Sequence, residues 1–263
     1  MIPAAFIAEW RALYPWPLDS QVEQDLIISR ALIEIFSNIE LAASLAFRGG
    51  TALHKLFVQP AGRYSEDIDL IQMNQEPIGP TLAKLRSVLD PWLGQPKREF
   101  NDGSVKLIYR VASEGQPSIP LRIKVEINTR EHFALDGWQE HPYSISSQWH
   151  PGSAKITTFT LEELLGTKLR ALYQRKKGRD LFDLSLCITT LRPDLKKVMT
   201  CFLEYMDRGG YKITAELFKN NLDDKMKDRR FTQDISPLLR PELSWNLGEA
   251  MGIVRSNLLW QFQ

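Results

Sequence analysis

Phe47–Leu53, with the sequence FRGGTAL, and Arg63–Leu70, with the sequence RYSEDIDL, predict a strand, a tight turn into a helix, and a second strand. An apolar run ends in two glycines and a threonine, and the second run carries aspartates at alternate positions. Residues two apart on a strand face the same side of a sheet. Asp67 and Asp69 can therefore point at one place, while Ile68 and Leu70 face a core.

Two neighbouring carboxylates repel each other, and a bound divalent cation relieves that repulsion. Mg²⁺, or Mn²⁺ in its place, suits them because it takes oxygen ligands and is often shared between carboxylates and the phosphates of an NTP. Gly49 and Gly50 lack a Cβ atom, so the backbone of their turn can approach a polyphosphate closely. The helix that follows Thr51 would direct free N–H groups at the same phosphates.

The glycine turn also has a simpler explanation, because many α/β proteins join a strand to a helix in this way. That explanation does not predict the aspartate strand that follows, so we favour phosphate binding. Ser65 precedes Asp67 by two positions and faces the same side. Arg63 supports the phosphates or caps the loop, and the two roles are equally consistent with the sequence. The candidate nucleotide-binding residues here are thus Gly49, Gly50, Thr51, Arg63 and Ser65.

This ordered set resembles the core of the DNA polymerase beta-type nucleotidyltransferases. The fuller pattern FRGGTALHKLF…RYSEDIDL resembles the AbiEii/AbiGii toxin family of bacterial toxin–antitoxin and phage-defence systems, over Val22 to Leu184. The resemblance implies an α/β (α+β) fold with a small mixed sheet followed by a helical domain. It also implies a Mg²⁺-dependent enzyme that transfers a nucleotide from an NTP to an acceptor, with the tRNA 3′ end as that acceptor and a neighbouring antitoxin protein as regulator.

The resemblance also implies a third carboxylate on a neighbouring strand, as metal ligand or as base toward the attacking hydroxyl. Glu126 matches it, in a stretch (121–128) whose apolar and polar residues alternate. Taken alone, Glu126 is better interpreted as an exposed residue of an edge strand that alternates with Arg122 and Lys124. After Asp67 and Asp69, we favour the site.

Lys168–Leu184 resembles a second signature of the same family. The resemblance implies that Lys168 binds the triphosphate and that Asp180 is a functional acid that orients Lys168 or the nucleotide. Asp183 would pair with Arg179 or Arg175. The alternative is a solvated basic helix end with ion pairs worth little, but the order of these residues after the aspartate strand favours the site.

The same segment is the candidate RNA contact, through Arg170, Arg175, Lys176 and Arg179. A protein that modifies only an RNA end needs a few phosphate contacts and no base-reading surface. We expect that end to enter between the two domains, where the active site would lie. Two other functions stay open: phosphoryl transfer to a protein, and a non-catalytic NTP- or RNA-binding module. The intact carboxylates argue against the second.

The composition is that of an ordinary globular protein, with 263 residues, 43% hydrophobic and 25% charged. A net charge of +1 gives no global electrostatic case for nucleic acid. No signal peptide or membrane-length apolar run is present, so we expect a cytoplasmic protein with no membrane partner. Cys187 and Cys201 lie in apolar, helical stretches, and we expect them to be buried without a disulfide.

The remaining pattern predicts the order of the elements. Glu23 and Asp25 are interpreted as the charged first turn of a helix. The domain boundary is expected after an irregular stretch over 132–153, giving a nucleotidyltransferase core with N-terminal helices over 1–153 and a helical domain over 154–263. Expected helices span 5–15, 19–38, 52–58, 80–93, 160–177, 194–207, 212–227 and 242–262, and expected strands or hairpins span 41–48, 65–72, 98–112 and 121–128. Thr160–Glu163 resembles a capping box at the start of the 160–177 helix, and Gly178 is expected to break that helix from a second one that carries Asp180 to Leu186.

Overall fold

The computed structural model describes residues 2–115 and 117–262. They form two compact units, Met1–Phe159 and Thr160–Gln263. The division falls after Phe159 and not after residue 153 as expected. The reason is that strand β7 (Gly152–Thr158) pairs with β1 (Leu45–Arg48) and with β6 (Gln139–Ile145), so it belongs to the first unit. The stretch over 132–153 is therefore only partly irregular.

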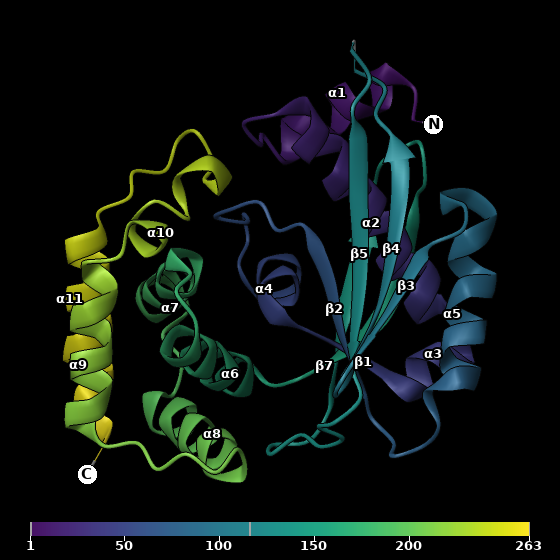
Figure 1. Cartoon of the computed structure of the whole chain (residues 1–263). Coiled ribbons are helices and arrows are strands. Elements are labelled where there is room, and N and C mark those ends of the chain that lie inside the picture. Colours follow the sequence, from purple (N-terminus) through teal and green to yellow (C-terminus); the bar gives the residue numbers. More distant parts are fainter. Residues whose placement is uncertain (1, 116, 263) are drawn as a thin grey trace. The chain divides into compact units, whose positions relative to one another are not determined.

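The first unit is built on one mixed sheet, which among the described residues has the strand order β3-β4-β5-β2-β1-β7-β6 (Figure 1). Its other strands are β2 (Asp67–Gln72), β3 (Lys97–Asn101), β4 (Ser104–Ala112) and β5 (Pro120–Asn128). The central pairs are β1 with β2, antiparallel, and β2 with β5, parallel. The mixed sheet confirms the expected α/β class, and it places the aspartate strand β2 at the centre.

Helices cover this sheet. They are α1 (Ala4–Leu13), α2 (Asp19–Ser37), α3 (Ile39–Ser44), α4 (Gly49–Ala52) and α5 (Ile78–Leu93), with a π-helical turn over Leu53–Phe57 directly after α4. Helix α2 packs on β5, β6 and β7 and lies beside α5 (Figure 1). Its apolar side chains, among them Leu26, Ile27 and Ile28, are fully buried. This helix therefore anchors the core of the first unit.

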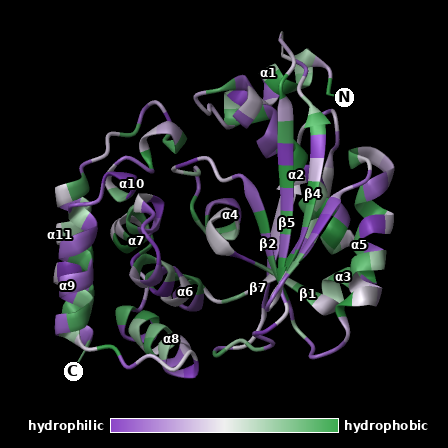
Figure 2. Cartoon of the chain, viewed as in Figure 1, coloured by the Kyte–Doolittle hydropathy of each residue, from purple (hydrophilic) through white to green (hydrophobic). Residues whose placement is uncertain are grey.

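Strand β5 shows why the sheet has two different faces. Its apolar residues, Leu121, Ile123, Val125 and Ile127, are all at most 4% exposed. The residues between them are polar, and Figure 2 shows the resulting alternation of colour along the strand. The alternation predicted for 121–128 is confirmed, and it leaves Lys124 and Glu126 on the face opposite the core.

The second unit consists of helices in its described part: α6 (Leu161–Gln174), α7 (Gly178–Leu191), α8 (Leu195–Arg208), α9 (Ala215–Met226), α10 (Arg229–Thr232) and α11 (Leu247–Leu258), with 3₁₀ turns over Ser236–Leu238 and Leu259–Gln261. Thr160 caps α6 by accepting a hydrogen bond from the Glu163 amide, as expected. Cys187 and Cys201 are buried and are not joined in a disulfide, which confirms that expectation. None of the described helices is long and apolar enough to cross a membrane.

Gly178 marks the start of α7 because nothing larger fits there. A Cβ atom at this position would lie 2.2 Å from the carbonyl oxygen of Phe231 on α10. The helix start can therefore approach the backbone of α10 only with glycine. The predicted break at Gly178 is confirmed, and its cause is close packing within the second unit.

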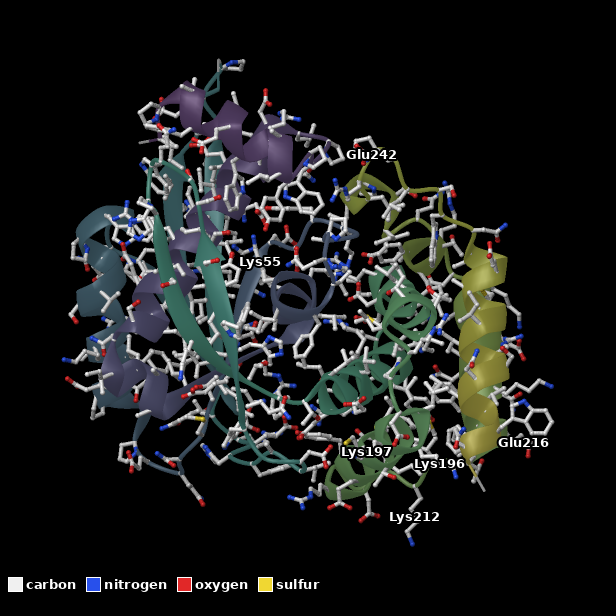
Figure 3. The ribbon with its side chains drawn as sticks, turned by 180° about the vertical axis from the view of Figure 1, so that it is seen from behind. Lys55, Lys196, Lys197, Lys212, Glu216 and Glu242 are labelled. Carbon is white, nitrogen blue, oxygen red and sulfur yellow. The ribbon has the colours of Figure 1, made fainter. Side chains whose placement is uncertain are left out.

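The interpretation of Glu23 and Asp25 as a charged first turn is wrong, because each is only 2% exposed. Asp25 accepts hydrogen bonds from Lys55 Nζ and from Trp10 Nε1, all at 2.8 Å. Lys55 is also buried and points into the first unit (Figure 3). Glu23 accepts a hydrogen bond from the Glu114 amide at 3.1 Å. These carboxylates thus tie α2 to α1, to the π-helical turn and to the residues after β4.

The buried pair makes a prediction for stability. Lys55→Met leaves the Asp25 carboxylate buried without its cation, so the free energy of unfolding should fall by about 3–5 kcal/mol. Lys84 is the matched control, because its pair with Glu40 is largely exposed. Lys84→Met should cost about 1 kcal/mol or less. Urea denaturation of both variants measures the difference, and equal losses would contradict the buried pair.

Candidate active site

The parallel pairing of β2 with β5 brings the predicted carboxylates together. In its register Asp67 is opposite Lys124, and Asp69 is opposite Glu126. Opposed residues of neighbouring strands present their side chains on the same face of a sheet. Asp67, Asp69 and Glu126 therefore share the face that points away from the core. Their side chains are neither fully buried nor fully exposed, so solvent and small ligands can reach them.

Lys124 lies among these acids, although the sequence predicts only a surface residue at this position. Its Nζ is 2.8 Å from Asp67 Oδ2 and 3.1 Å from Glu126 Oε2. Burial by itself lowers the pKa of Lys124, but the hydrogen bond to Asp67 and the nearby acids outweigh burial and leave that pKa raised. Lys124 is thus a cation held between two of the predicted metal ligands.

Gly49 is required by the close approach of Asp69. Its φ of +79° lies in the left-handed region, and an added Cβ would be 2.4 Å from Asp69 Oδ2. The glycine turn and the aspartate strand therefore meet at Gly49 and Asp69. The sequence predicted that the two segments belong to one site, but it did not show this contact. Burial and the charge of Asp67 raise the pKa of Asp69, while Lys124 and Arg48 act in the opposite direction.

Thr51, Ser65 and Arg63 brace the loop before β2. The Thr51 hydroxyl donates a hydrogen bond to the Asp67 carbonyl oxygen and lies 2.8 Å from Ser65 Oγ. Arg63 is 2% exposed, and its Nη1 donates to the Tyr64 carbonyl oxygen at 2.9 Å. These contacts hold the start of β2 against α4. Binding of phosphate by these three side chains stays a prediction.

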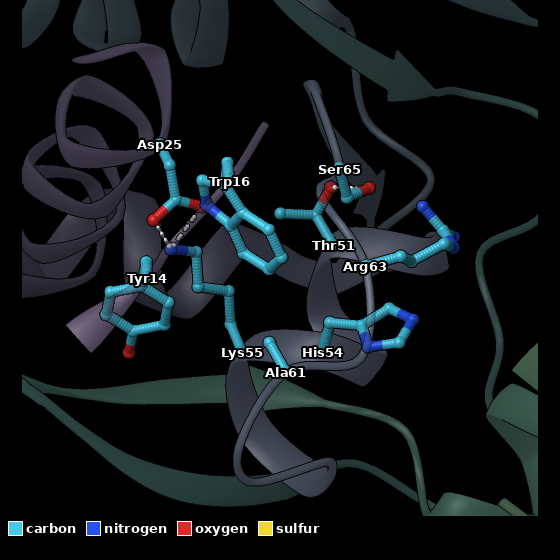
Figure 4. Close-up of a pocket in the computed structure, with 9 residues that line it drawn as sticks. All are labelled: Tyr14, Trp16, Asp25, Thr51, His54, Lys55, Ala61, Arg63 and Ser65. Carbon is cyan, nitrogen blue, oxygen red and sulfur yellow. Dashed lines mark hydrogen bonds and ion pairs between the residues drawn. The ribbon is translucent and has the colours of Figure 1, made fainter. Parts of the chain in front are cut away.

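Two hollows flank this region, and only one has room for a substrate. The first is lined by Thr51, Arg63, Ser65 and the Asp25–Lys55 pair (Figure 4), and it offers about 10 Å³, the space of one water molecule. The second is about 390 Å³ and is lined in part by Asp67, Arg122 and Lys124. Small-molecule sites are commonly 300–1,000 Å³, so of these two hollows only the second has the volume of a small-molecule site.

The acids fit Mg²⁺ by their chemistry, since they are hard oxygen ligands on one face. Among the described residues, however, there is no group of three acid, histidine or cysteine side chains already arranged around a metal position. The Lys124 ammonium stands where a cation would bridge Asp67 and Glu126. The donor set therefore suits a divalent cation once Lys124 moves aside.

In the second unit, Lys168 and Asp180 meet as the sequence predicted. Lys168 Nζ is 3.1 Å from Asp180 Oδ1 and 2.9 Å from Asp183 Oδ2, so Asp183 pairs with Lys168, and its expected pairing with Arg179 or Arg175 stays a prediction. Both aspartates are fully buried and Lys168 is 6% exposed. Burial alone would raise the pKa of Asp180, but Lys168 and Arg175 outweigh it and leave that pKa lowered. Triphosphate binding by Lys168 stays a prediction.

The basic segment that follows is paired with acids of its own unit. Arg175 binds Asp180 through two nitrogens, at 2.7 and 2.8 Å. Lys176 pairs with Asp228 and Arg179 pairs with Asp234. Arg170 lies over the Tyr205 ring, 4.7 Å from its centroid. Much of the positive charge that predicted an RNA contact is therefore already compensated within the second unit.

Comparison with solved structures shows the fold. MenT4, a nucleotidyltransferase toxin from Mycobacterium tuberculosis H37Rv, is similar with a TM-score of 0.67 and 16% identity, covering 99% of this chain and 90% of that one. JHP933 from Helicobacter pylori is similar with a TM-score of 0.54 and 15% identity, covering 92% and 91%. No curated protein matches the chain.

The family is shown by the sequence profile described as nucleotidyl transferase AbiEii toxin, type IV toxin–antitoxin system, which matches residues 30–252. The match spans both units and includes the aspartate strand, Glu126 and the Lys168–Asp180 pair. A nucleotidyltransferase requires an NTP as its substrate, and the hollow beside Asp67 has the size for one. This chain therefore belongs to the AbiEii family of nucleotidyltransferase toxins from type IV toxin–antitoxin systems.

Proposed function

We propose that this toxin transfers a nucleotide from an NTP to the 3′-terminal hydroxyl of an RNA, with tRNA as the acceptor, in a reaction that depends on Mg²⁺. One observation carries the proposal. Three carboxylates, Asp67, Asp69 and Glu126, share one face of two paired strands, directly beside the Gly49 turn. That combination suits a metal-bound triphosphate.

Asp67 and Asp69 would hold the metal, and Glu126 would help on the side of the acceptor. The metal, when bound, polarises the α-phosphate and neutralises charge on the leaving group. The acceptor oxygen forms a bond to the α-phosphorus, and the bond to the β-phosphate oxygen breaks to release pyrophosphate. The Glu126 carboxylate, whose side chain is 27% exposed, is the general base that accepts the hydroxyl proton.

The chain offers several groups for the nucleotide itself. The backbone of Gly49 and Gly50 can approach the β- and γ-phosphates without steric conflict. Arg122 and Lys124 add positive charge to the hollow beside Asp67. Thr51 and Ser65 act indirectly, because their hydroxyls hold the start of the aspartate strand in place. Lys168 and Asp180 are the corresponding candidates in the second unit.

The RNA acceptor and the antitoxin partner are proposed on different grounds. Arg175 and Lys176 each remain about half exposed although each is paired with an acid. At Lys176, phosphates of an RNA could exchange with Asp228 at modest cost, since pairs near the surface are weak, whereas the partner of Arg175, Asp180, is fully buried. The type IV toxin–antitoxin family suggests an antitoxin protein as partner. The exposed Lys196 and Lys197 at the start of α8 (Figure 3) are further cations within reach of solvent.

The acceptor can be tested by label transfer. Incubation with each α-labelled NTP, Mg²⁺ and purified tRNA should label the tRNA, and periodate oxidation of its 3′ terminus should prevent labelling. Undiminished transfer to oxidised tRNA would exclude the terminal hydroxyl. Label that appears only from γ-labelled NTP, and on protein, would instead favour phosphoryl transfer.

The carboxylates can be tested by charge removal. Asp67→Asn and Asp69→Asn should each lower transfer by about 100-fold or more, because each removes a charged ligand of the metal that the reacting phosphates need. Circular dichroism and thermal melting should show a folded protein in both cases. Glu76→Gln, an exposed acid beyond the end of β2, is the control and should keep full transfer. Full transfer by either aspartate variant would falsify the assignment.

The glycine turn can be tested by adding one methyl group. Gly49→Ala should lower transfer by about 10-fold or more, because a Cβ at this positive φ pushes against the Asp69 carboxylate. Gly252→Ala is the matched control, since Gly252 lies in the interior of helix α11 and a Cβ there meets no atom within 4 Å. That change should leave transfer unchanged and stabilise the protein by about 0.5–1 kcal/mol. Transfer rates and urea midpoints of the two variants decide the matter.

A further inference from the structure

Lys124 lies between two of the three carboxylates, Asp67 and Glu126. It projects from β5 on the same face as Glu126 and is opposite Asp67 across the parallel pair. Its ammonium contacts one oxygen of each acid, Asp67 Oδ2 at 2.8 Å and Glu126 Oε2 at 3.1 Å. The side chain is only 18% exposed. One cation supplied by the chain thus bridges two acids from neighbouring strands.

A divalent metal would use the same oxygen lone pairs. Lys124 donates N–H groups to oxygens that a metal would have to coordinate directly. Both cations cannot occupy the space between Asp67 and Glu126 at once. The described residues contain no preformed group of three acid, histidine or cysteine ligands.

We propose that Lys124 is a built-in counter-cation of the carboxylates, which a divalent metal must displace before the site can work. The inference rests on the proposed metal role of Asp67, Asp69 and Glu126. In the metal-free protein, Lys124 offsets the repulsion among these acids and keeps β2 and β5 in register. A divalent metal therefore binds weakly when no nucleotide is present, because it can coordinate Asp67 and Glu126 only after their ion pairs with Lys124 are broken.

A nucleotide changes that balance. The displaced ammonium needs a new anionic partner, and Lys124 also lines the hollow that fits an NTP. A triphosphate in this hollow supplies the partner, so metal and nucleotide favour each other's binding. Lys124 is in this sense a positioning residue that makes the site assemble only when metal and NTP arrive together.

Lys106 provides a matched control. It lies on β4 opposite Glu126, and its Nζ is 3.4 Å from Glu126 Oε1. Its exposure, 25%, is close to that of Lys124. Lys106 therefore carries the same charge at a similar depth, but it contacts one of the three acids and bridges none. If the effect on metal binding is only a general electrostatic one, removal of either lysine changes the metal affinity equally. If the metal displaces an ammonium, removal of Lys124 alone changes that affinity strongly.

The test is a Mn²⁺ titration without nucleotide, followed by electron paramagnetic resonance of free Mn²⁺. Lys124→Met should bind Mn²⁺ about 10-fold or more tighter than wild type, since a full charge only a few ångströms from the metal is removed. Lys106→Met should change the affinity by less than about 3-fold. Equal changes in the two variants would overturn displacement in favour of general electrostatics. Should Lys124→Met fail to fold, Lys124→Gln carries the same expectation.

Thermal melting gives a second readout that requires no catalysis. Without metal, Lys124→Met should melt below wild type, because the acids lose their cation. Saturating Mn²⁺ should raise the melting temperature of Lys124→Met more than that of wild type. An equal metal-dependent rise in both proteins would count against the proposal.

The Asp67→Asn change separates this inference from the proposed function. If Lys124→Met binds Mn²⁺ no tighter than wild type while Asp67→Asn abolishes binding, Lys124 is not displaced but the metal site stands. If Asp67→Asn leaves Mn²⁺ binding unchanged in both the wild-type and Lys124→Met backgrounds, the metal binds elsewhere and the proposed function loses its metal site. Tighter binding in Lys124→Met that Asp67→Asn removes supports both.

Discussion

The parallel pairing of β2 with β5 is the constraint on which the rest of the site depends. It aligns Asp69 with Glu126 and Asp67 with Lys124. A slip of one residue would turn one set of side chains to the other face of the sheet. The apolar residues of both strands oppose such a slip, because they are almost completely buried on the opposite face. The hydrophobic core thus sets the spacing of charged groups that do not belong to it.

Charge on this face cannot remain uncompensated. Carboxylates that share one face of two paired strands repel one another. Lys124 pairs with Asp67 and Glu126, Lys106 pairs with Glu126, and the charges of Lys124 and Arg48 lower the pKa of Asp69 against the effect of burial. In the displacement proposed above, the group that moves is one lysine side chain, while the acids stay on the paired strands.

Each unit also contains a buried lysine that is held by buried acids. In the first unit Lys55 binds Asp25 and Ser29, and in the second Lys168 binds Asp180 and Asp183. Breaking such a pair is costly, while the pair itself adds little net stability over apolar packing. Such pairs therefore fix the positions of the segments that carry them more than they add to stability. For Lys168, this structural duty and a role in triphosphate binding are compatible if the nucleotide approaches the same ammonium.

The sequence by itself determined the fold class and which acidic residues share the polar face of the sheet. Period-two alternation placed Asp67, Asp69 and Glu126 on polar strand faces, and the glycine pair marked the turn beside them. Such patterns are local, and local patterns report which side of a strand faces the core. The order of helices after Thr160 followed from the same kind of pattern. The boundary at Phe159 did not, because β7 joins the first unit only through its pairing with distant strands.

Tertiary structure alone decided how the charged residues are partnered. Glu23, Asp25, Lys55 and Lys124 look like ordinary surface residues in the sequence, and nothing in their local context predicts burial or pairing. Their partners lie far away along the chain: Asp25 meets Lys55, and Lys124 meets Asp67. An ion pair of this kind is a property of two segments brought together by folding, so no local pattern records it. The position of Lys124 among the acids follows from the β2–β5 register, which only the packed core determines.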